Sequence, residues 1–232
     1  MLHVSGFCQE DDTRPPKVNN FKEDSSFAAF NQYHVSVAKA QIVSLKKGAL
    51  LVRLKTNANT IHRLKAAGNI DLATQVERET YLNNKTIMRA YRNEFNFCPV
   101  YFFLSDVSDS VKHRHLENIF VDSNLVVDPA INCKATFYLI AEQGTICESS
   151  LGLVSEAQAA TAIERGAASK EVSIVVKNRY FKQLHKPFPY YQAGYSLKKY
   201  GDYVKRFNML LTDFYTKNSS YVIPPEIMKY VY

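Results

Sequence analysis

The residues most able to do chemistry are polar side chains that come soon after apolar runs of the sequence. Asn57, Asp106, Asp109 and Arg179 each lie just beyond such a run. If the runs are strands of an open α/β sheet, these residues lie near the carboxyl ends of strands, where such sheets bind their ligands. The sequence therefore offers an enzyme hypothesis, with an active site around Asp106 and Arg179 and a reaction that remains unspecified.

The same region contains the one sequence cluster of metal-ligand residue types. Asp106 and Asp109 are followed by His113 and His115. Their spacing matches neither a loop for a hard cation nor the three or four convergent groups that zinc requires. We expect the aspartates to cap helices and turns and the histidines to be exposed, with no metal or other cofactor bound.

Sequence motifs for nucleophilic catalysis and phosphate binding are missing. The chain has no Gly-x-Ser-x-Gly, no Walker loop and no Gly-x-Gly-x-x-Gly. Because it has only eight glycines, we do not expect a backbone cradle for phosphate. These observations favour a protein that is not an enzyme.

Basic residues concentrate between Lys177 and Arg206. This segment has eight basic residues and one acid, Asp202, so its net charge of +7 equals that of the whole chain. Aromatic residues are interleaved with them, which suits an anionic polymer because cations hold its charged groups while rings stack on bases or sugars. Alternatively, the rings pack in the core and the loop around residues 187–191 only anchors the chain. The predicted binding residues are Lys182, Lys186, Tyr190, Tyr191, Lys198 and Lys199.

The stretch from Gly48 to Leu104 determines the predicted architecture. Its two ends, Ala49–Leu54 and Val100–Leu104, are nearly continuous in apolar residues. Such runs are typical of strands in a parallel sheet that is covered on both faces. The residues between them favour helix, so this stretch is predicted to be a strand, a helical crossover and a second strand.

Two helices are predicted within the crossover, one from Asn59 to Gly68 and one from Ile70 to Glu94. At ~1.5 Å per residue the second helix is ~37 Å long, whereas a strand of seven residues covers only ~23 Å. Part of this helix must therefore overhang the sheet. Its polar middle, around Asn83, is either a contact surface for a partner or a solvated turn.

Further strands are predicted on both sides of this unit. Tyr33–Val37 and Gln41–Leu45 alternate apolar and polar residues, which is typical of edge strands. Ala135–Ala141 and Val172–Val176 are also strand-like, and a capping box at Ser155–Gln158 begins a helix between them. A right-handed crossover through that helix would make these two strands parallel.

The end of the chain is predicted to be a helix and a tail. Apolar residues keep helical spacing from Leu197 to Lys217. Beyond this helix, residues 218–232 are expected to be extended, because Pro224 and Pro225 each disfavour helix in the residue before them.

Together these elements predict an α/β fold, with a mostly parallel or mixed sheet of four to five strands and helices on both faces. Residues 32–217 form one domain, preceded by an N-terminal arm at 10–31 and followed by the extended tail. The predicted core consists of Leu51, Val52, Leu54, Val100, Phe102, Phe137, Leu139, Ile174, Val175, Phe207 and Leu211.

The order of elements from Gly48 to Lys217 resembles the thioredoxin-like core, in which strand, helix, strand and helix lead into two antiparallel strands and a final helix. The resemblance rests on this order alone. The redox dithiol of that family should follow the first strand, where this chain has Thr56-Asn57-Ala58-Asn59. Redox activity is therefore not implied.

The N-terminal residues suggest a location for the protein. Residues 1–9 are apolar and small, and the composition changes abruptly at Glu10. They resemble the end of a secretory signal peptide, which predicts export to the periplasm or cell envelope; the alternative is a cytoplasmic protein with a frayed N-terminus. No run of eighteen apolar residues is present, so no transmembrane segment is expected.

The cysteine pattern adds little to this expectation. Without residues 1–9 three cysteines remain, Cys98, Cys133 and Cys147, an odd number that lacks Cys-x-x-Cys spacing. We expect Cys98 to be a small core residue. A bridge between Cys133 and Cys147 is compatible with the sequence.

Two classes of function follow. The first is an exported, non-enzymatic envelope or assembly protein that binds a protein or an anionic polymer through the overhanging helix or the basic segment; nucleic acid is not an expected partner of an exported protein. The second is the enzyme with its site at the strand ends. A pocket with convergent polar groups at those ends would favour the enzyme, and broad convex surfaces would favour the binding protein. We prefer the binding protein because no motif indicates catalysis.

Overall fold

The computed structural model describes residues 23–144 and 172–231. Contacts between residues divide the chain into two compact units, residues 1–33 and 34–232. All the strands assigned in the described ranges belong to the second unit. Within those ranges no helix is both long enough and apolar enough to cross a bilayer.

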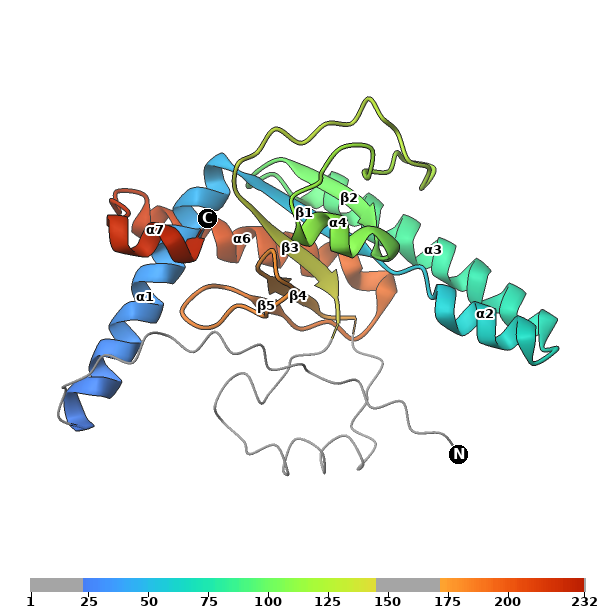
Figure 1. Cartoon of the computed structure of the whole chain (residues 1–232), viewed down its shortest axis with the longest axis horizontal. Helices are drawn as coiled ribbons and strands as arrows, with labels where there is room; N and C mark the ends of the chain where they lie inside the picture. Colours follow the sequence, from blue (N-terminus) through green and yellow to red (C-terminus); the bar gives the residue numbers. More distant parts are fainter. Residues whose placement is uncertain (1–22, 145–171, 232) are drawn as a thin grey trace. The chain divides into compact units, whose positions relative to one another are not determined.

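A mixed sheet of five strands is the centre of the second unit (Figure 1). Its strands are β1 (Ala49–Leu54), β2 (Val100–Leu104), β3 (Tyr138–Gln143), β4 (Ile174–Lys177) and β5 (Tyr191–Gln192), in the spatial order β2-β1-β3-β4-β5. Strand β1 is parallel to both of its neighbours, whereas β4 is antiparallel to β3 and β5. The predicted α/β fold is therefore confirmed.

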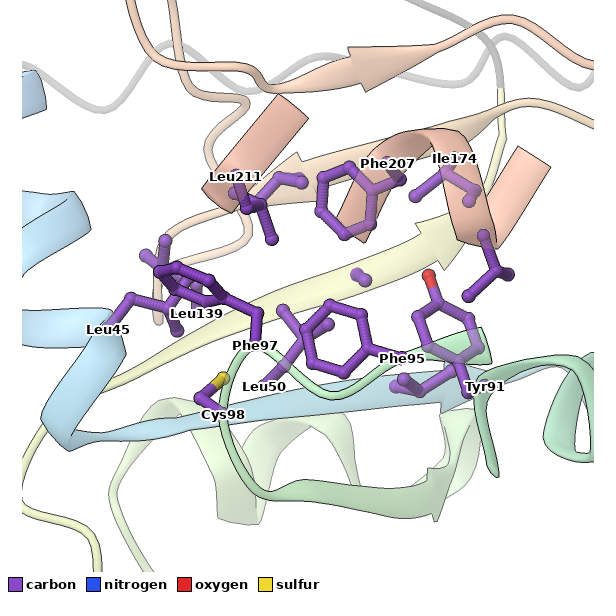
Figure 2. Close-up of a cluster of buried hydrophobic side chains, with 14 of the residues drawn as sticks. Leu45, Leu50, Tyr91, Phe95, Phe97, Cys98, Leu139, Ile174, Phe207 and Leu211 are labelled. Carbon is purple, nitrogen blue, oxygen red and sulfur yellow. The ribbon is translucent and has the colours of Figure 1, made fainter. Parts of the chain in front are cut away.

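Helices α1 (Glu23–Lys47), α3 (Ile70–Glu94) and α6 (Tyr200–Asn218) contribute to the core on one face of this sheet. Because successive side chains of a strand point to opposite faces, Leu50 and Val52 of β1 belong to this core. Figure 2 shows Leu50 of β1 and Leu139 of β3 in the same cluster as Phe207 of α6. This cluster is the larger of the two hydrophobic cores.

The other face of the sheet is covered by shorter structure. Leu51 of β1 packs there with Val111 of α4 (Ser108–Lys112) and with Phe120, which lies in irregular chain beyond α4. Ten of the eleven predicted core residues are buried, divided between the two faces, and the eleventh, Val100, is partly buried against the larger core.

Helices α2 (Ala58–Ala66) and α3 form a hairpin that extends beyond the sheet (Figure 1). No residue of α2 is buried, and Ala73 is the one buried residue in α3 before Asn84. Only the second half of α3 contributes its apolar face to the core. The overhang predicted from the length of the helix is thus present.

The strands predicted at Tyr33–Val37 and Gln41–Leu45 are wrong, because α1 covers both and also includes the end of the predicted arm at 10–31. The β-branched residues of this region suggest strand, but strand propensity depends strongly on context. Ala38, Ile42 and Leu45, at helical spacing, are buried in the larger core. Burial of this helical face prevails over the local alternation.

The turn from α1 into β1 needs a glycine. A Cβ atom on Gly48 would lie 2.3 Å from the carbonyl oxygen of Phe137, so no larger residue fits without a shift of the backbone. The next amide, that of Ala49, donates a hydrogen bond to the same oxygen, at 3.1 Å. Gly48 therefore allows β1 to begin directly against β3.

The predicted parallel pairing of the third and fourth strands is also wrong, since β3 and β4 are antiparallel. The rule used for that prediction applies only to connections that cross over the sheet between parallel strands. The capping box at Ser155–Gln158 lies outside the described residues. The antiparallel pair followed by α6 keeps the thioredoxin-like order of elements, which stays a resemblance only.

The tail predicted to be extended contains a helix instead, α7 (Pro225–Val231). Proline disfavours helix in the residue before it, but at the first helical position its fixed φ is favourable and its missing N–H has no intrahelical partner to lose. Pro225 occupies that position. The proline therefore starts the helix rather than preventing it.

We expect replacement of Phe207 by Ala to lower the free energy of unfolding by about 3–5 kcal/mol, because it leaves a cavity in the larger core. Phe207 is fully buried and stacks on Phe95 with 6.1 Å between ring centroids. Met209→Ala on the same helix is the control, because Met209 is 55% exposed; its expected change is within about 0.5 kcal/mol. Urea unfolding measures both, and equal effects would contradict the predicted packing.

Candidate functional site

The carboxyl ends of the parallel strands carry a network of charged side chains. Arg53 of β1 donates from Nη1 to Oε2 of Glu142 on β3, at 3.0 Å, and Lys177 of β4 contacts the other carboxylate oxygen at 2.5 Å. The Nε atom of Arg53 donates to Oγ of Ser108 at 2.9 Å. These contacts connect three strands of the sheet and the start of α4.

Glu142 is the centre of this network. Burial of its carboxyl acts to raise its pKa, but the charges and hydrogen bonds of Lys177 and Arg53 outweigh burial and hold the pKa below its ordinary value of 4.5. The guanidinium of Arg53 also lies over the ring of Phe181, 5.4 Å from the centroid. The carboxylate is therefore stabilised in its charged form, as a structural ion pair requires.

Hydroxyl groups close the same ends of the strands. The backbone amide of Thr56 donates to Oγ of Ser105 at 3.1 Å, and the hydroxyl of Thr56 donates to Oδ1 of Asp106 at 2.5 Å. Ser108 accepts from Arg53 and donates to the carbonyl oxygen of Ser105. The carboxylate of Asp106 is thus the group that accepts from the hydroxyl of Thr56, and these bonds link the segment after β1 to the segment after β2.

Asn57, another predicted strand-end residue, has a structural role. It is the N-cap of α2, with a φ of 53°, and its side-chain NH₂ donates to Oγ1 of Thr80 at 2.7 Å. Asn84, from the polar middle of α3, is buried and donates to the carbonyl oxygen of Lys55. The polar side chains of α3 therefore hold the hairpin to the sheet.

The structure does not bring Asp106 and Arg179 together. Because β4 is antiparallel to β3, Arg179 follows β4 at the level of the amino end of β3, where Tyr138 begins that strand. Asp106 follows β2, which is parallel to β1, at the opposite edge. The convergence that an active site around these two residues would need is missing.

Asp109 and the neighbouring histidines are exposed. His113 Nδ1 lies 3.5 Å from Oδ2 of Asp109 and 2.9 Å from its carbonyl oxygen, and the ring of His115 is 6.3 Å from that of His113. In the described ranges, 23–144 and 172–231, no three His, Cys, Asp or Glu side chains gather closely enough to hold a metal ion.

The predicted basic and aromatic surface is divided by the fold. Lys182, Lys186, Lys198 and Lys199 are exposed, as a binding surface requires. Tyr190 is only 7% exposed, and half-buried Tyr191 has its hydroxyl 3.1 Å from Oγ of Ser173. The rings thus contribute to packing, and the exposed lysines lack the two stacking partners that the sequence suggested.

Two cysteines can be placed. Cys98 is buried, as expected, and burial raises the pKa of its thiol to about 12, so it is inert as a nucleophile. Cys133 is also a buried free thiol, and burial raises its pKa. Cys147 lies outside the described residues.

Sequence reasoning missed the charged network and a second group of cations. Arg53 interrupts an otherwise apolar strand, and a charge in such a strand needs a partner, so it could have predicted a carboxylate on a neighbouring strand. A second group, Arg114, Arg179 and Lys229, lines one cavity. No sequence signal connects residues so far apart along the chain.

Comparisons with protein-family models, with curated proteins and with solved structures found no match. Functional inference therefore depends on the geometry of the molecule itself.

We expect Glu142→Gln to lower the free energy of unfolding at neutral pH by about 2–3 kcal/mol, because two half-buried cations lose their counter-charge. The pKa of Glu142 is lowered in the folded state. The contribution of its carboxylate to the free energy of unfolding is therefore fully present above the unfolded-state pKa and is lost as the pH falls through the folded-state pKa. The difference between wild type and variant should therefore narrow below pH ~4.

Urea unfolding at a series of pH values checks this. Glu77→Gln is the control, because Glu77 pairs with Lys65 on the exposed hairpin, where a pair is worth at most about 1 kcal/mol. If E142Q lowers the free energy of unfolding by the same amount at every pH, the role given to the carboxylate is contradicted.

Proposed function

We propose that the protein is a non-enzymatic binding protein that engages a protein partner through the projecting α2–α3 hairpin. The observation that carries this proposal is that the distal half of the hairpin exposes large apolar side chains and contributes little to the core. Ile70, Leu72, Tyr81 and Leu82 are 47–55% exposed. Exposed apolar side chains that lie together mark interaction surfaces, and Ile70 and Tyr81 lie on the same side of α3.

The hairpin supports itself, so its surface is formed before any partner arrives. Lys65 of α2 pairs with Glu77 of α3 at 2.6 Å, and Asn57 bonds to Thr80. Ala73 is fully buried although it lies beyond the core. A preformed surface avoids the entropic cost of ordering on association.

The hairpin face offers a specific kind of contact. Ile70 and Tyr81 are eleven residues apart, close to three helical turns, so they lie on the same side of α3. Residues 57–83 contain three basic and three acidic side chains, which cancel, while the chain as a whole carries +7. The expected partner surface is therefore apolar and close to neutral.

This hairpin is favoured over the other two candidate sites for specific reasons. The predicted polymer-binding surface would need the rings of Tyr190 and Tyr191 open to solvent, and Tyr190 is buried instead. An enzyme would need convergent groups, and Asp106 and Arg179 are at opposite edges of the sheet. Of these three candidate sites in the described part of the chain, the hairpin is the one that combines exposure, apolar character and independence from the core.

We further propose that the protein works in the periplasm or cell envelope, as an envelope or assembly component, with the cytoplasm as the alternative. The support is the composition of residues 1–9, which resembles the end of a secretory signal peptide. Those residues lie outside the described part of the chain.

The hairpin proposal predicts a specific cross-link in cells of the source organism. A photo-reactive residue at Gln75, which is exposed on α3, should form an adduct with one defined protein, which is then identified and purified. Ile70→Ser combined with Tyr81→Ser should weaken the affinity for that protein by at least about tenfold, equivalent to about 1.4 kcal/mol. Calorimetric titration of the purified pair measures the change.

Two control variants make this result specific. Met209→Ser combined with Leu210→Ser removes two exposed apolar side chains from α6, and replacement of all four exposed lysines by Gln removes the basic surface. The lysines replaced are Lys182, Lys186, Lys198 and Lys199 of the predicted basic surface. Both control variants should bind the partner as the wild type does. If the hairpin variant binds the partner as tightly as the wild type does, or if the lysine variant binds it more weakly, the proposal is overturned.

The location is tested separately. Cell fractionation should recover the protein with periplasmic markers, and sequencing of its N-terminus should begin close to Glu10, where the composition changes, because signal peptides are removed on export. Recovery from the cytosol with Met1 or Leu2 at the N-terminus would end the export hypothesis.

A further inference from the structure

A cavity of about 70 Å³ lies at the amino end of β3, away from the α2–α3 hairpin. Segments from distant parts of the sequence form it: α1, the chain after α4, β3, the turn after β4, and α7. We call it the cation cavity. The side chains that matter here are Gln41, Arg114, Tyr138, Arg179, Tyr180 and Lys229.

Three cations line this cavity, and they come from three separate segments. Arg114 follows α4, Arg179 follows β4 and Lys229 belongs to α7. The lining residues within the described ranges include no Asp or Glu. Burial raises the pKa of Tyr138, while the charges of Arg114 and Arg179, which line the same cavity, act to lower it.

Gln41 gives a second, independent indication of a ligand. It lies on α1 with only 8% of its surface exposed, and its side chain has no hydrogen-bond partner in the described part of the chain. The amide NH₂ is therefore available to donate a hydrogen bond to a ligand in the cavity.

Arg179 is held in place before any ligand binds. The turn that carries it is fixed by Asn178, whose Oδ1 accepts hydrogen bonds from the amides of Tyr180 and Lys182 at 2.9 and 3.0 Å. Its guanidinium lies over the ring of Tyr180, 4.4 Å from the centroid, and donates to the hydroxyl of that residue. A fixed guanidinium can bind an oxyanion through two parallel hydrogen bonds with little loss of entropy.

We infer that the cation cavity is a binding site for one phosphate group. The guanidinium of Arg179 and the amide of Gln41 supply hydrogen-bond donors from two sides, and Arg114 and Lys229 add positive charge, which suits a doubly charged tetrahedral anion better than a planar carboxylate. The small volume admits one such group rather than a chain of them. The recognition uses side chains, so it needs none of the glycine-rich motifs that the sequence lacks.

The apolar part of the lining bears on what the phosphate is attached to. Phe137, Leu139 and Val231 border the cavity beside the ring of Tyr180. A phosphate monoester with an apolar or aromatic group next to the phosphate would cover this surface. The site goes beyond the protein-binding function proposed above and does not depend on it.

Titration of the wild-type protein with inorganic phosphate tests the inference. Heteronuclear NMR detects the binding, and sulfate and acetate are the comparison anions. Phosphate should shift the side-chain amide signal of Gln41 in a saturable manner and bind more tightly than acetate. Arg179→Gln should weaken phosphate at least tenfold. Lys198→Gln is the matched control: it removes one positive charge at an exposed position that does not line the cavity, and it should leave the affinity unchanged.

Two further variants keep the test decisive. Gln41→Leu retains every charge but removes the amide, so a loss of affinity in this variant supports a built site over general attraction to a basic protein. Lys229→Gln changes an exposed residue of α7 and serves if R179Q does not fold. Absence of saturable phosphate binding, equal losses in R179Q and K198Q, unchanged binding in Q41L, or acetate binding as tightly as phosphate would each overturn the inference.

Discussion

The position of β1 between two parallel neighbours is the constraint on which the rest of the structure depends. A parallel pair cannot be closed by a tight turn, so each neighbour of β1 needs a long connection. The same arrangement places the carboxyl ends of β1, β2 and β3 at one edge. Arg53 is the charged residue of β1, and its position next to the last residue of the strand places it within reach of Glu142 on β3, whose carboxylate also pairs with Lys177 of β4. Architecture and electrostatics therefore have a common origin in one strand.

The hairpin follows from the same constraint. The strands β1 and β2 are adjacent. The helix that crosses between them therefore needs to be only as long as these strands in order to cover them. Helix α3 does so with its second half, where Ile87 and Tyr91 are buried. Its first half has no sheet beneath it and is paired with α2 instead. Because the core does not need this part, its exposed apolar residues are where the protein-binding proposal is centred.

The sequence predicts the parts of the fold that depend on local pattern and fails where distant contacts decide. The bounds of β1, β2 and α3 agree with the apolar runs and helical spacing. Helix α1 was missed because its alternation also fits a strand, and only burial against the sheet selects the helix. The direction of β4 is set by pairing with β3, which no local signal encodes. That direction decides where Arg179 lies, which is at the other end of the strands from Asp106.

The two proposed binding regions are separated by the length of the sheet. Helix α2 begins beyond the carboxyl end of β1, whereas the cation cavity lies at the amino end of β3. Because Ala49 pairs with Tyr138 in parallel register, the amino ends of β1 and β3 are level. A strand of six residues spans about 17 Å between these levels. The regions also differ in charge, since the hairpin is neutral and the cavity has three cations. Under the two proposals, each region can therefore be occupied while the other is bound, and each takes its own class of ligand.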